Sequence, residues 1–237
     1  MHKTIRLTDT QKHSMSWGQF IGSVLFAFFG TGLLTLFIAL PVTIYTSDLT
    51  DKKQIALYES IGNTASTLLQ LLVLLLFIYK YEPAKNLLSS AFNFRALKQL
   101  STYIYLLLFF ALNIVLNSLI LTHLFPDATT QQASALNLDI LEQYQVLLII
   151  GFAIFTPIFE EIIFRGIILR FFSERFPFWI AAIGTSLLFG VAHTYSLGVM
   201  VVTFLMGLLM AILCKRTNSI LPAMLFHIMN NTLAFLT

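Results

Sequence analysis

Charged side chains are scarce in this sequence of 237 residues, because Asp, Glu, Lys and Arg together make up only 11% of it. A soluble globular domain carries roughly 25% charged residues, so the composition excludes an ordinary soluble protein. Cysteine is almost absent too: Cys214 stands alone, which excludes an internal disulfide. The sequence contains no H-E-x-x-H and no G-x-S-x-G pattern, which are signatures of zinc-dependent and serine-dependent hydrolysis.

Apolar residues take the place of the missing charges. They make up 57% of the chain, and the mean hydropathy is +0.83. Runs of about 17–25 apolar residues recur, each long enough to cross a bilayer core of roughly 30 Å, without the alternation of barrel strands. The predicted fold class is all-α, a polytopic transmembrane helix bundle with about seven spans. Their approximate limits are 17–45, 56–80, 102–125, 146–173, 178–195, 197–214 and 219–236.

Basic residues in the connections predict the orientation of the bundle. Alternate connections are rich in Lys and Arg, whereas the polar segment 126–145 has none, and cytoplasmic loops carry such an excess. We therefore expect an integral protein of the plasma membrane with its N-terminus in the cytoplasm and its C-terminus outside. The first apolar run is interpreted as a retained helix rather than a signal peptide. The basic residues are Lys3, Arg6 and Lys12, then Lys80, Lys85, Arg95 and Lys98, then Arg170 and Arg175, then Lys215 and Arg216.

The stretch "TPIFEEIIFRGIIL", residues 156–169, places Glu160, Glu161 and Arg165 in an otherwise apolar run. An ionisable group at membrane depth costs at least about 2.5–3.5 kcal/mol, so these side chains are not expected to face lipid. Glu161 and Arg165 are four residues apart and can pair on one helix. Glu160 lies about 100° round the helix from Glu161 and therefore needs a different partner.

Later helices offer such partners. "LFGVAHTYS" carries His193, with Phe189 one turn before it, and "LFHIMNNTL" carries His227 and Asn231 on one helix face. Counting residues from the intervening turns places these groups at depths that tilted helices can bring together with Glu160. We therefore expect four polar groups from three helices to meet inside the bundle.

Proline predicts a local irregularity beside the acidic pair. Pro157 cannot donate a backbone hydrogen bond, so it should free the carbonyl near Ala153 and kink the helix just before Glu160. Thr156 is a candidate cap for the segment that follows.

Each of these residues also has a purely structural interpretation. Glu161 and Arg165 could form a structural ion pair, a single histidine in an apolar helix often serves only in packing, and Asn230 and Asn231 could bond between helices. The conjunction favours function, because acidic residues within the predicted spans are almost confined to Glu160 and Glu161.

The combination permits amide hydrolysis without a covalent intermediate. A carboxylate, Glu160, can take a proton from water while the imidazole of His193 orients that water, and His227 with Asn231 can donate hydrogen bonds to the oxyanion. Thr185, Ser186 and Cys214 offer no comparable nucleophile. A metal remains the alternative, since Glu160, His193 and His227 are a legitimate zinc set with water as the fourth ligand; spacing alone does not decide between the two.

At these residues the sequence resembles the CAAX protease and bacteriocin-processing family of intramembrane proteases, called CPBP or Abi, which includes the type II CAAX prenyl endopeptidases. "EEIIFR", "FGVAH" and "HIMNN" match the EExxxR, FxxxH and HxxxN patterns of that family in order, over roughly residues 145–236. The resemblance implies that Glu160 and His193 activate water and that His227 and Asn231 form the oxyanion hole. Glu161, Arg165 and Phe189 are assigned supporting roles.

The resemblance divides the chain into a cytoplasmic leader (1–16), peripheral helices and loops (17–145) and a catalytic core (146–237). It implies a glutamate-dependent or metal-dependent endopeptidase that acts on a peptide or a membrane-anchored protein. The expected partners are that substrate and the lipid bilayer, and no nucleic acid is expected. No cofactor is required on this interpretation, and one divalent metal such as Zn is the alternative. The competing functions are a membrane adaptor or bacteriocin self-immunity protein and, with less support, a proton-coupled transporter.

Overall fold

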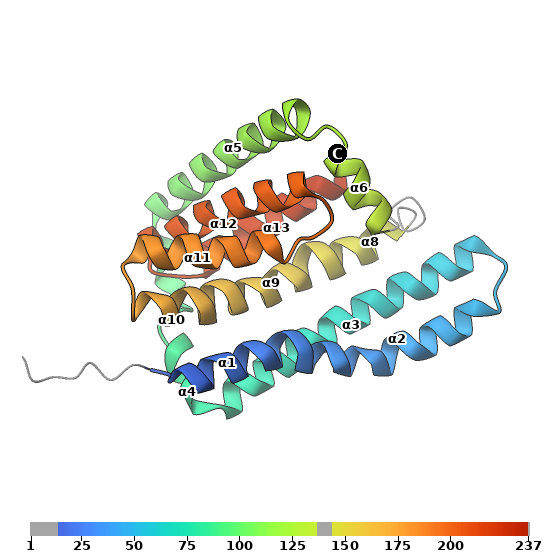
Figure 1. Cartoon of the computed structure of the whole chain (residues 1–237), viewed down its shortest axis with the longest axis horizontal. Helices are drawn as coiled ribbons and strands as arrows, with labels where there is room; N and C mark the ends of the chain where they lie inside the picture. The colour runs from blue at the N-terminus through green and yellow to red at the C-terminus, as the bar shows by residue number, and fades with distance from the viewer. Residues whose placement is uncertain (1–13, 137–143, 237) are drawn as a thin grey trace, which may run out of the picture.

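The protein is described by a computed structural model that covers residues 14–136 and 144–236 (Figure 1). The described residues are helical and contain no strand, which confirms the predicted fold class. The basic residues Lys3, Arg6 and Lys12 of the predicted leader lie outside the described residues. The helices are α1 (Trp17–Leu25), α2 (Thr31–Ser47), α3 (Lys52–Lys80), α4 (Glu82–Leu88), α5 (Leu100–His123), α6 (Ala128–Ala135), α8 (Gln145–Leu148), α9 (Thr156–Glu161), α10 (Leu169–Ser173), α11 (Phe178–Val191), α12 (Leu197–Thr217) and α13 (Leu221–Leu236).

Within the described residues, four short segments belong to other helix types. Three are π-helical, and they join neighbouring α-helices into continuous rods: η1 (Phe26–Gly30), η4 (Ile149–Phe155) and η5 (Ile162–Ile168). The fourth, η2 (Phe94–Lys98), is a 3₁₀ turn before α5. A π-helical segment inside an α-helix is rare and occurs frequently at functional sites, and two of the three flank the acidic pair.

Five helices of the described chain are long and apolar enough to cross a membrane: Trp17–Ser47, Lys52–Lys80, Leu100–His123, Gln145–Ser173 and Leu197–Thr217. The protein is therefore an integral membrane protein. The remaining two predicted spans correspond to the shorter apolar helices Phe178–Val191 and Leu221–Leu236. A perpendicular crossing needs about 20 residues, so the predicted count of about seven spans stays a prediction.

Local sequence explains several helix ends. Ser16 and Gln19 form a capping box at the start of α1, and Ser196 accepts a hydrogen bond from the Val199 amide at the start of α12. Such side chains satisfy amides that the first helical turn leaves free. Asn218 adopts a left-handed conformation with φ of 49°, which asparagine tolerates better than most residues. That residue ends α12 and lets the chain return as α13.

The rod formed by α8, η4, α9, η5 and α10 lies at the centre of the fold. It packs against α3 on one side and against α13 and α11 on the others, while α5 covers α12 and α13 (Figure 1). Gly190 allows α11 to approach α12 closely, because a Cβ atom there would lie 2.7 Å from the Met200 carbonyl oxygen. The central position of the rod removes its charged side chains from lipid.

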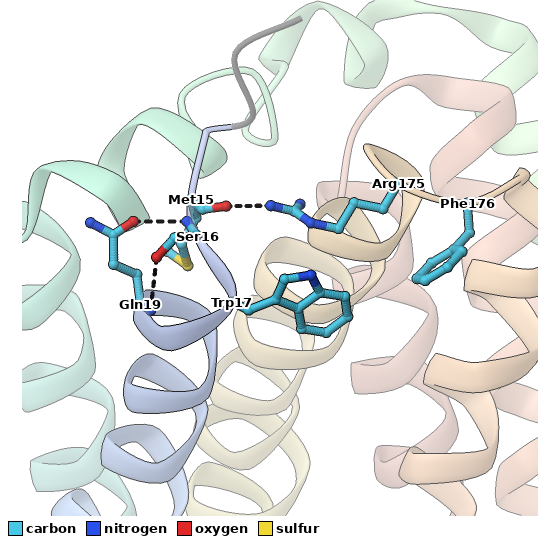
Figure 2. A pocket seen from close by; sticks show the side chains of 6 residues that line it. All are labelled: Met15, Ser16, Trp17, Gln19, Arg175 and Phe176. Carbon is cyan, nitrogen blue, oxygen red and sulfur yellow. Dashed lines mark hydrogen bonds between the residues drawn. The ribbon is translucent and has the colours of Figure 1, made fainter. Parts of the chain in front are cut away.

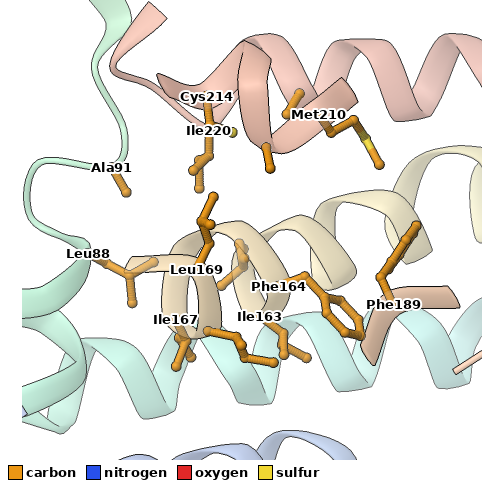
Figure 3. Close-up of a cluster of buried hydrophobic side chains, with 14 of the residues drawn as sticks. Leu88, Ala91, Ile163, Phe164, Ile167, Leu169, Phe189, Met210, Cys214 and Ile220 are labelled. Carbon is orange, nitrogen blue, oxygen red and sulfur yellow. The ribbon is translucent and has the colours of Figure 1, made fainter. Parts of the chain in front are cut away.

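The main hydrophobic core surrounds η5. Ile163, Phe164 and Ile167 are buried against Leu88 of α4, Phe189 of α11 and Met210 of α12 (Figure 3). All seven residues of η5 are buried, including Arg165. This packing fixes the helix that follows the acidic pair.

The start of α1 is fastened to the turn between α10 and α11. The guanidinium of Arg175 donates to the Met15 carbonyl (Figure 2). It also lies 3.6 Å from the centre of the Phe171 ring. Ser14 donates its backbone amide and hydroxyl to the Glu174 carboxylate at 3.1 and 2.5 Å. These contacts tie the first peripheral helix to the core.

Candidate active site

Three chain segments bring the predicted polar groups together. Glu160 lies on α9, and His227 and Asn231 lie on α13. His193 lies in the turn after α11, since that helix ends at Val191 and the His193 amide donates to the Gly190 carbonyl at 3.0 Å. The predicted helical limit of 195 is therefore wrong by about one turn, yet the histidine still reaches the site.

Glu160 faces both imidazole rings. Its Oε1 lies 4.0 Å from Nε2 of His193, and its Oε2 lies 3.6 Å from Nε2 of His227. The Glu160 side chain is 20% exposed, so it is accessible from a cavity rather than sealed in the core. The expected meeting of Glu160 with partners from two later segments is present in the structure.

Glu161 and Arg165 form the predicted pair, with Nη1 of Arg165 2.8 Å from Oε1 of Glu161 and both side chains fully buried. Nη2 of Arg165 donates to the Gly207 carbonyl at 3.3 Å. The same Glu161 oxygen is 3.1 Å from Nδ1 of His227, a contact that the sequence did not predict. A carboxylate oxygen accepts hydrogen bonds, so Nδ1 of His227 is the donor in this contact.

Phe189 supports both histidines. Its backbone carbonyl is 2.8 Å from Nδ1 of His193, and a carbonyl can only accept, so that nitrogen carries the hydrogen. Its ring contacts the His193 and His227 rings edge-on at 4.7 and 5.6 Å and lies 4.4 Å from the Arg165 guanidinium. The predicted supporting role of Phe189 agrees with this placement, and it leaves Nε2 of His193 directed at Glu160.

The irregularity at Pro157 differs from the prediction. The chain does not start a new helix there, because Thr156 has helical φ and ψ and its hydroxyl donates to the Gly151 carbonyl at 3.1 Å; the prediction that Thr156 caps a second segment is wrong. In the π register of η4, the amide of residue 157 would bond the Phe152 carbonyl, and proline has no N–H. The carbonyl left by proline is thus that of Phe152 rather than of Ala153.

The side chain of Asn231 forms a hydrogen bond with that carbonyl. Its Nδ2 donates to the Phe152 oxygen at 3.1 Å, and its Oδ1 accepts from Nδ2 of Asn230 at 3.2 Å. Oδ1 of Asn230 in turn accepts from Nδ2 of Asn113 on α5 at 2.9 Å. Sequence reasoning singled out Asn230 for bonding between helices, which the structure shows, and missed Asn113. The available signal for Asn113 was an amide in the middle of an apolar span.

A cavity of about 470 Å³ contains the site. Glu160, His193, His227 and Asn231 all line it, between α5, α6, α12 and α13. Glu160 and Thr156 also line a second, more apolar cavity of about 500 Å³ on the side of α3 and η1. Glu160 is therefore accessible from both sides of the central rod.

Tyr195 lines the first cavity just beyond His193, in the connection between α11 and α12. Burial raises the pKa of the Tyr195 phenol above its ordinary value of 10.0, and the negative charge of Glu160 raises it further. Tyr195 therefore keeps its hydroxyl hydrogen at neutral pH and can donate it to a molecule in the cavity.

The metal-dependent alternative stays open beside the glutamate-only one. Within residues 14–136 and 144–236, no group of three His, Cys, Asp or Glu side chains is placed to hold a metal ion. The metal set that the sequence suggested, Glu160, His193 and His227, stays a prediction. Thr185, Ser186 and Cys214, which the sequence did not favour as nucleophiles, are buried.

Comparison with known proteins identifies the same part of the chain. Residues 142–233 match the sequence model of the family described as type II CAAX prenyl endopeptidase Rce1-like. An "Uncharacterized 24.3 kDa protein" of Escherichia coli is 34% identical over 95 residues, which are 38% of this chain and 44% of that protein. The "Putative membrane peptidase YdiL" of Bacillus subtilis (strain 168) is 35% identical over 95 residues, 40% of this chain and 38% of that protein.

The similarity spans about two fifths of the length of these relatives, and no solved structure matches the chain. The matched region begins just before the central rod and ends within α13, so it contains all three motifs and every predicted site residue. The resemblance predicted from those motifs is confirmed over residues 142–233, which match the sequence model of the Rce1-like type II CAAX prenyl endopeptidases.

Proposed function

We propose that the protein is an intramembrane endopeptidase that hydrolyses a peptide bond of a membrane-associated substrate with water activated by Glu160 and His193. Similarity to the Rce1-like family supports a membrane protease at the level of the family. The observation that carries the proposal is the placement of Glu160 between Nε2 of His193 and Nε2 of His227, at 4.0 and 3.6 Å, in one cavity.

The geometry supports a simple first step. A water molecule can bond Glu160 Oε1 and His193 Nε2 together, because two ordinary hydrogen bonds of about 2.8 Å span the 4.0 Å between them. Glu160 takes one proton from the water while the water oxygen forms a bond to the carbonyl carbon of the substrate. When the C–N bond breaks, the same proton passes from Glu160 to the leaving nitrogen.

His227 and Asn231 suit the stabilisation of the oxyanion. Nδ1 of His227 is bonded to Glu161, so Nε2 is the ring nitrogen directed at Glu160 and the cavity. Asn231 uses one N–H for the Phe152 carbonyl, and its amide nitrogen has a second N–H for a substrate oxygen. Two preorganised donors of this kind are a common source of rate enhancement in amide hydrolysis.

The surroundings agree with a substrate held at the membrane. The connections around α4 and η2, between α10 and α11, and between α12 and α13 lie at one end of the bundle (Figure 1). These connections carry the Lys and Arg residues on which the proposed orientation in the plasma membrane, with a cytoplasmic N-terminus, depends. A peptide or membrane-anchored protein is the proposed substrate, and prenylation of it is a separate question.

The test uses purified full-length protein in proteoliposomes and an internally quenched peptide that the wild type cleaves. Glu160→Gln and His193→Ala should each lower kcat by about 10²–10⁴-fold, the usual contribution of a general acid or base, with unchanged insertion. Glu82→Gln is the matched control, because that carboxylate is exposed on α4. Metal analysis of the same preparation tests the zinc alternative directly.

Full activity of Glu160→Gln would overturn the proposal. An in vivo phenotype that survives Glu160→Gln and His193→Ala but not deletion of the peripheral helices would instead indicate the adaptor or immunity role.

A further inference from the structure

Three asparagine side chains form a continuous chain of hydrogen bonds from α5 to the site. Asn113 donates to Asn230, Asn230 donates to Asn231, and Asn231 donates to the Phe152 carbonyl, at 2.9, 3.2 and 3.1 Å. The first of these residues lies outside the matched region 142–233. The last is the proposed oxyanion donor, so the chain of amides links a peripheral helix to the reaction.

The direction of this chain is determined at its inner end. A main-chain carbonyl can only accept, so Asn231 must present its nitrogen to Phe152 and its oxygen to Asn230. Asn230 must then present its nitrogen to Asn231, which leaves its oxygen for Asn113. Each amide therefore has one orientation that satisfies its neighbours, and rotation of any one by half a turn would place two like atoms in contact.

Burial makes that orientation matter energetically. Asn113 is 1% exposed, and it is one of three buried residues on a helix that mostly faces lipid, with Thr102 and Leu106. In such surroundings an unpaired amide costs several times more than a single net hydrogen bond contributes. The hydrogen bond to Asn230 explains why Asn113 lies on the covered face of α5, against α13.

We propose that Asn113 is a positioning residue for catalysis: acting through Asn230, it holds the Asn231 amide with its nitrogen toward the substrate cavity. This inference rests on the proposed function, because it assigns to α5 a role in the same reaction. Without Asn113, the Asn230 side chain is no longer held in place, Asn231 is restrained by the Phe152 carbonyl alone, and its second N–H is less closely aligned with the oxyanion.

The test compares isosteric substitutions in the full chain with the quenched-peptide assay. Asn113→Leu should lower kcat by about 10- to 100-fold, the cost of a misplaced group, and leave KM within twofold. Asn230→Leu should give the same result. Thr102→Val is the matched control: it lies on the same helix, is equally buried and should leave kcat unchanged.

A double-mutant cycle separates positioning from simple structural support. If Asn113 acts only through Asn231, then Asn113→Leu should have no further effect on kcat in an Asn231→Ala background. Additive losses, or a wild-type kcat in Asn113→Leu, would overturn the inference while leaving the protease intact. Wild-type cleavage that persists in Glu160→Gln would instead remove the proposed function, and the positioning role with it.

Discussion

The peripheral helices and the central ones differ in how much of their surface the protein covers. In the most apolar windows of the first three long helices, Trp17–Ser47, Lys52–Lys80 and Leu100–His123, 17, 17 and 11% of the residues are buried. In Gln145–Ser173 and Leu197–Thr217 the corresponding values are 39 and 44%. Both groups are equally apolar in sequence, so hydropathy shows that a helix enters the membrane but not what surrounds it there.

The covered helices are the ones that carry buried charge. Glu161 and Arg165 are removed from lipid by α11, α12 and α13 and have polar partners in His227 and the Gly207 carbonyl. Across α1 to α5 most described charges lie near helix ends, as Lys52, Lys80 and Glu82 do, and Glu59 lies two turns inside α3. Protein packing replaces water as the environment in which ionised groups can be held.

The largest expected effect comes from breaking the buried pair. Arg165→Leu should destabilise the protein by roughly 3–5 kcal/mol, because it leaves Glu161 buried without its counter-ion. The exposed pair of the peripheral region provides the control: Lys85 lies 3.1 Å from Glu82 with side chains 51 and 66% exposed, and Lys85→Ala should cost about 0–1 kcal/mol. Thermal unfolding in detergent measures both, and equal shifts would contradict the contrast between the two regions.

Proline substitution gives the next largest effect and again separates the two regions. Pro157→Ala supplies an N–H that competes with Asn231 for the Phe152 carbonyl, so kcat should fall about tenfold through loss of orientation. Pro41→Ala in α2, also inside a helix, should leave kcat at the wild-type value and give the helix back a hydrogen bond. An identical response of kcat to both substitutions would disprove the special role of residue 157.

The fastening of α1 to the core predicts a smaller change. Arg175→Ala removes the bond to the Met15 carbonyl and the contact with the Phe171 ring. We expect a loss of roughly 1 kcal/mol in stability with kcat unaltered, because α1 supplies no group to the catalytic cavity. Limited proteolysis near residue 14 should become faster, and a fall in kcat beyond twofold would show that α1 influences the chemistry.

The smallest effect is expected at Tyr195. Since burial and the charge of Glu160 raise its pKa, the phenol should remain protonated past its ordinary value of about 10. Tyr195→Phe should reduce kcat/KM by about two- to threefold, the worth of one weak hydrogen bond. The difference in tyrosinate absorbance between wild type and Tyr195→Phe reports the titration, and a midpoint at or below 10 would contradict the assignment.

Hydrophobic runs and their polar boundaries predicted most of the helices. The predicted span 146–173 agrees with Gln145–Ser173, and 102–125 differs from Leu100–His123 by two residues at each end. These limits follow from composition, which changes abruptly where the chain leaves the apolar layer. Whether Phe178–Val191 and Leu221–Leu236 cross the membrane depends on tilt and neighbours, which composition does not contain.

The predicted site was recoverable because its residues have helical spacing. The pair Glu161–Arg165 follows from a separation of four, and the same rule placed His227 and Asn231 on one face. The contact between His227 and Glu161 was missed, as was Asn113, because both depend on how separate helices rotate against each other. The π register of η4 was missed for the same reason: Pro157 signals a lost hydrogen bond, but packing decides which carbonyl is left without it.

The two π-helical segments on either side of Glu160 and Glu161 determine where along the rod a change in chain length can be absorbed without moving the site. Each widened turn holds one residue more than an ordinary helix would need to cover the same rise. Deleting a single residue within Ile149–Phe155 would let that stretch relax to the common form and leave Glu160 at about the same angle, whereas the same deletion in an ordinary α-helical part of the rod would swing Glu160 by about 100°. Two related genes could therefore share every motif letter and each lack one codon, yet only the protein that loses its residue from the π-helical segment would keep its glutamate at the histidines.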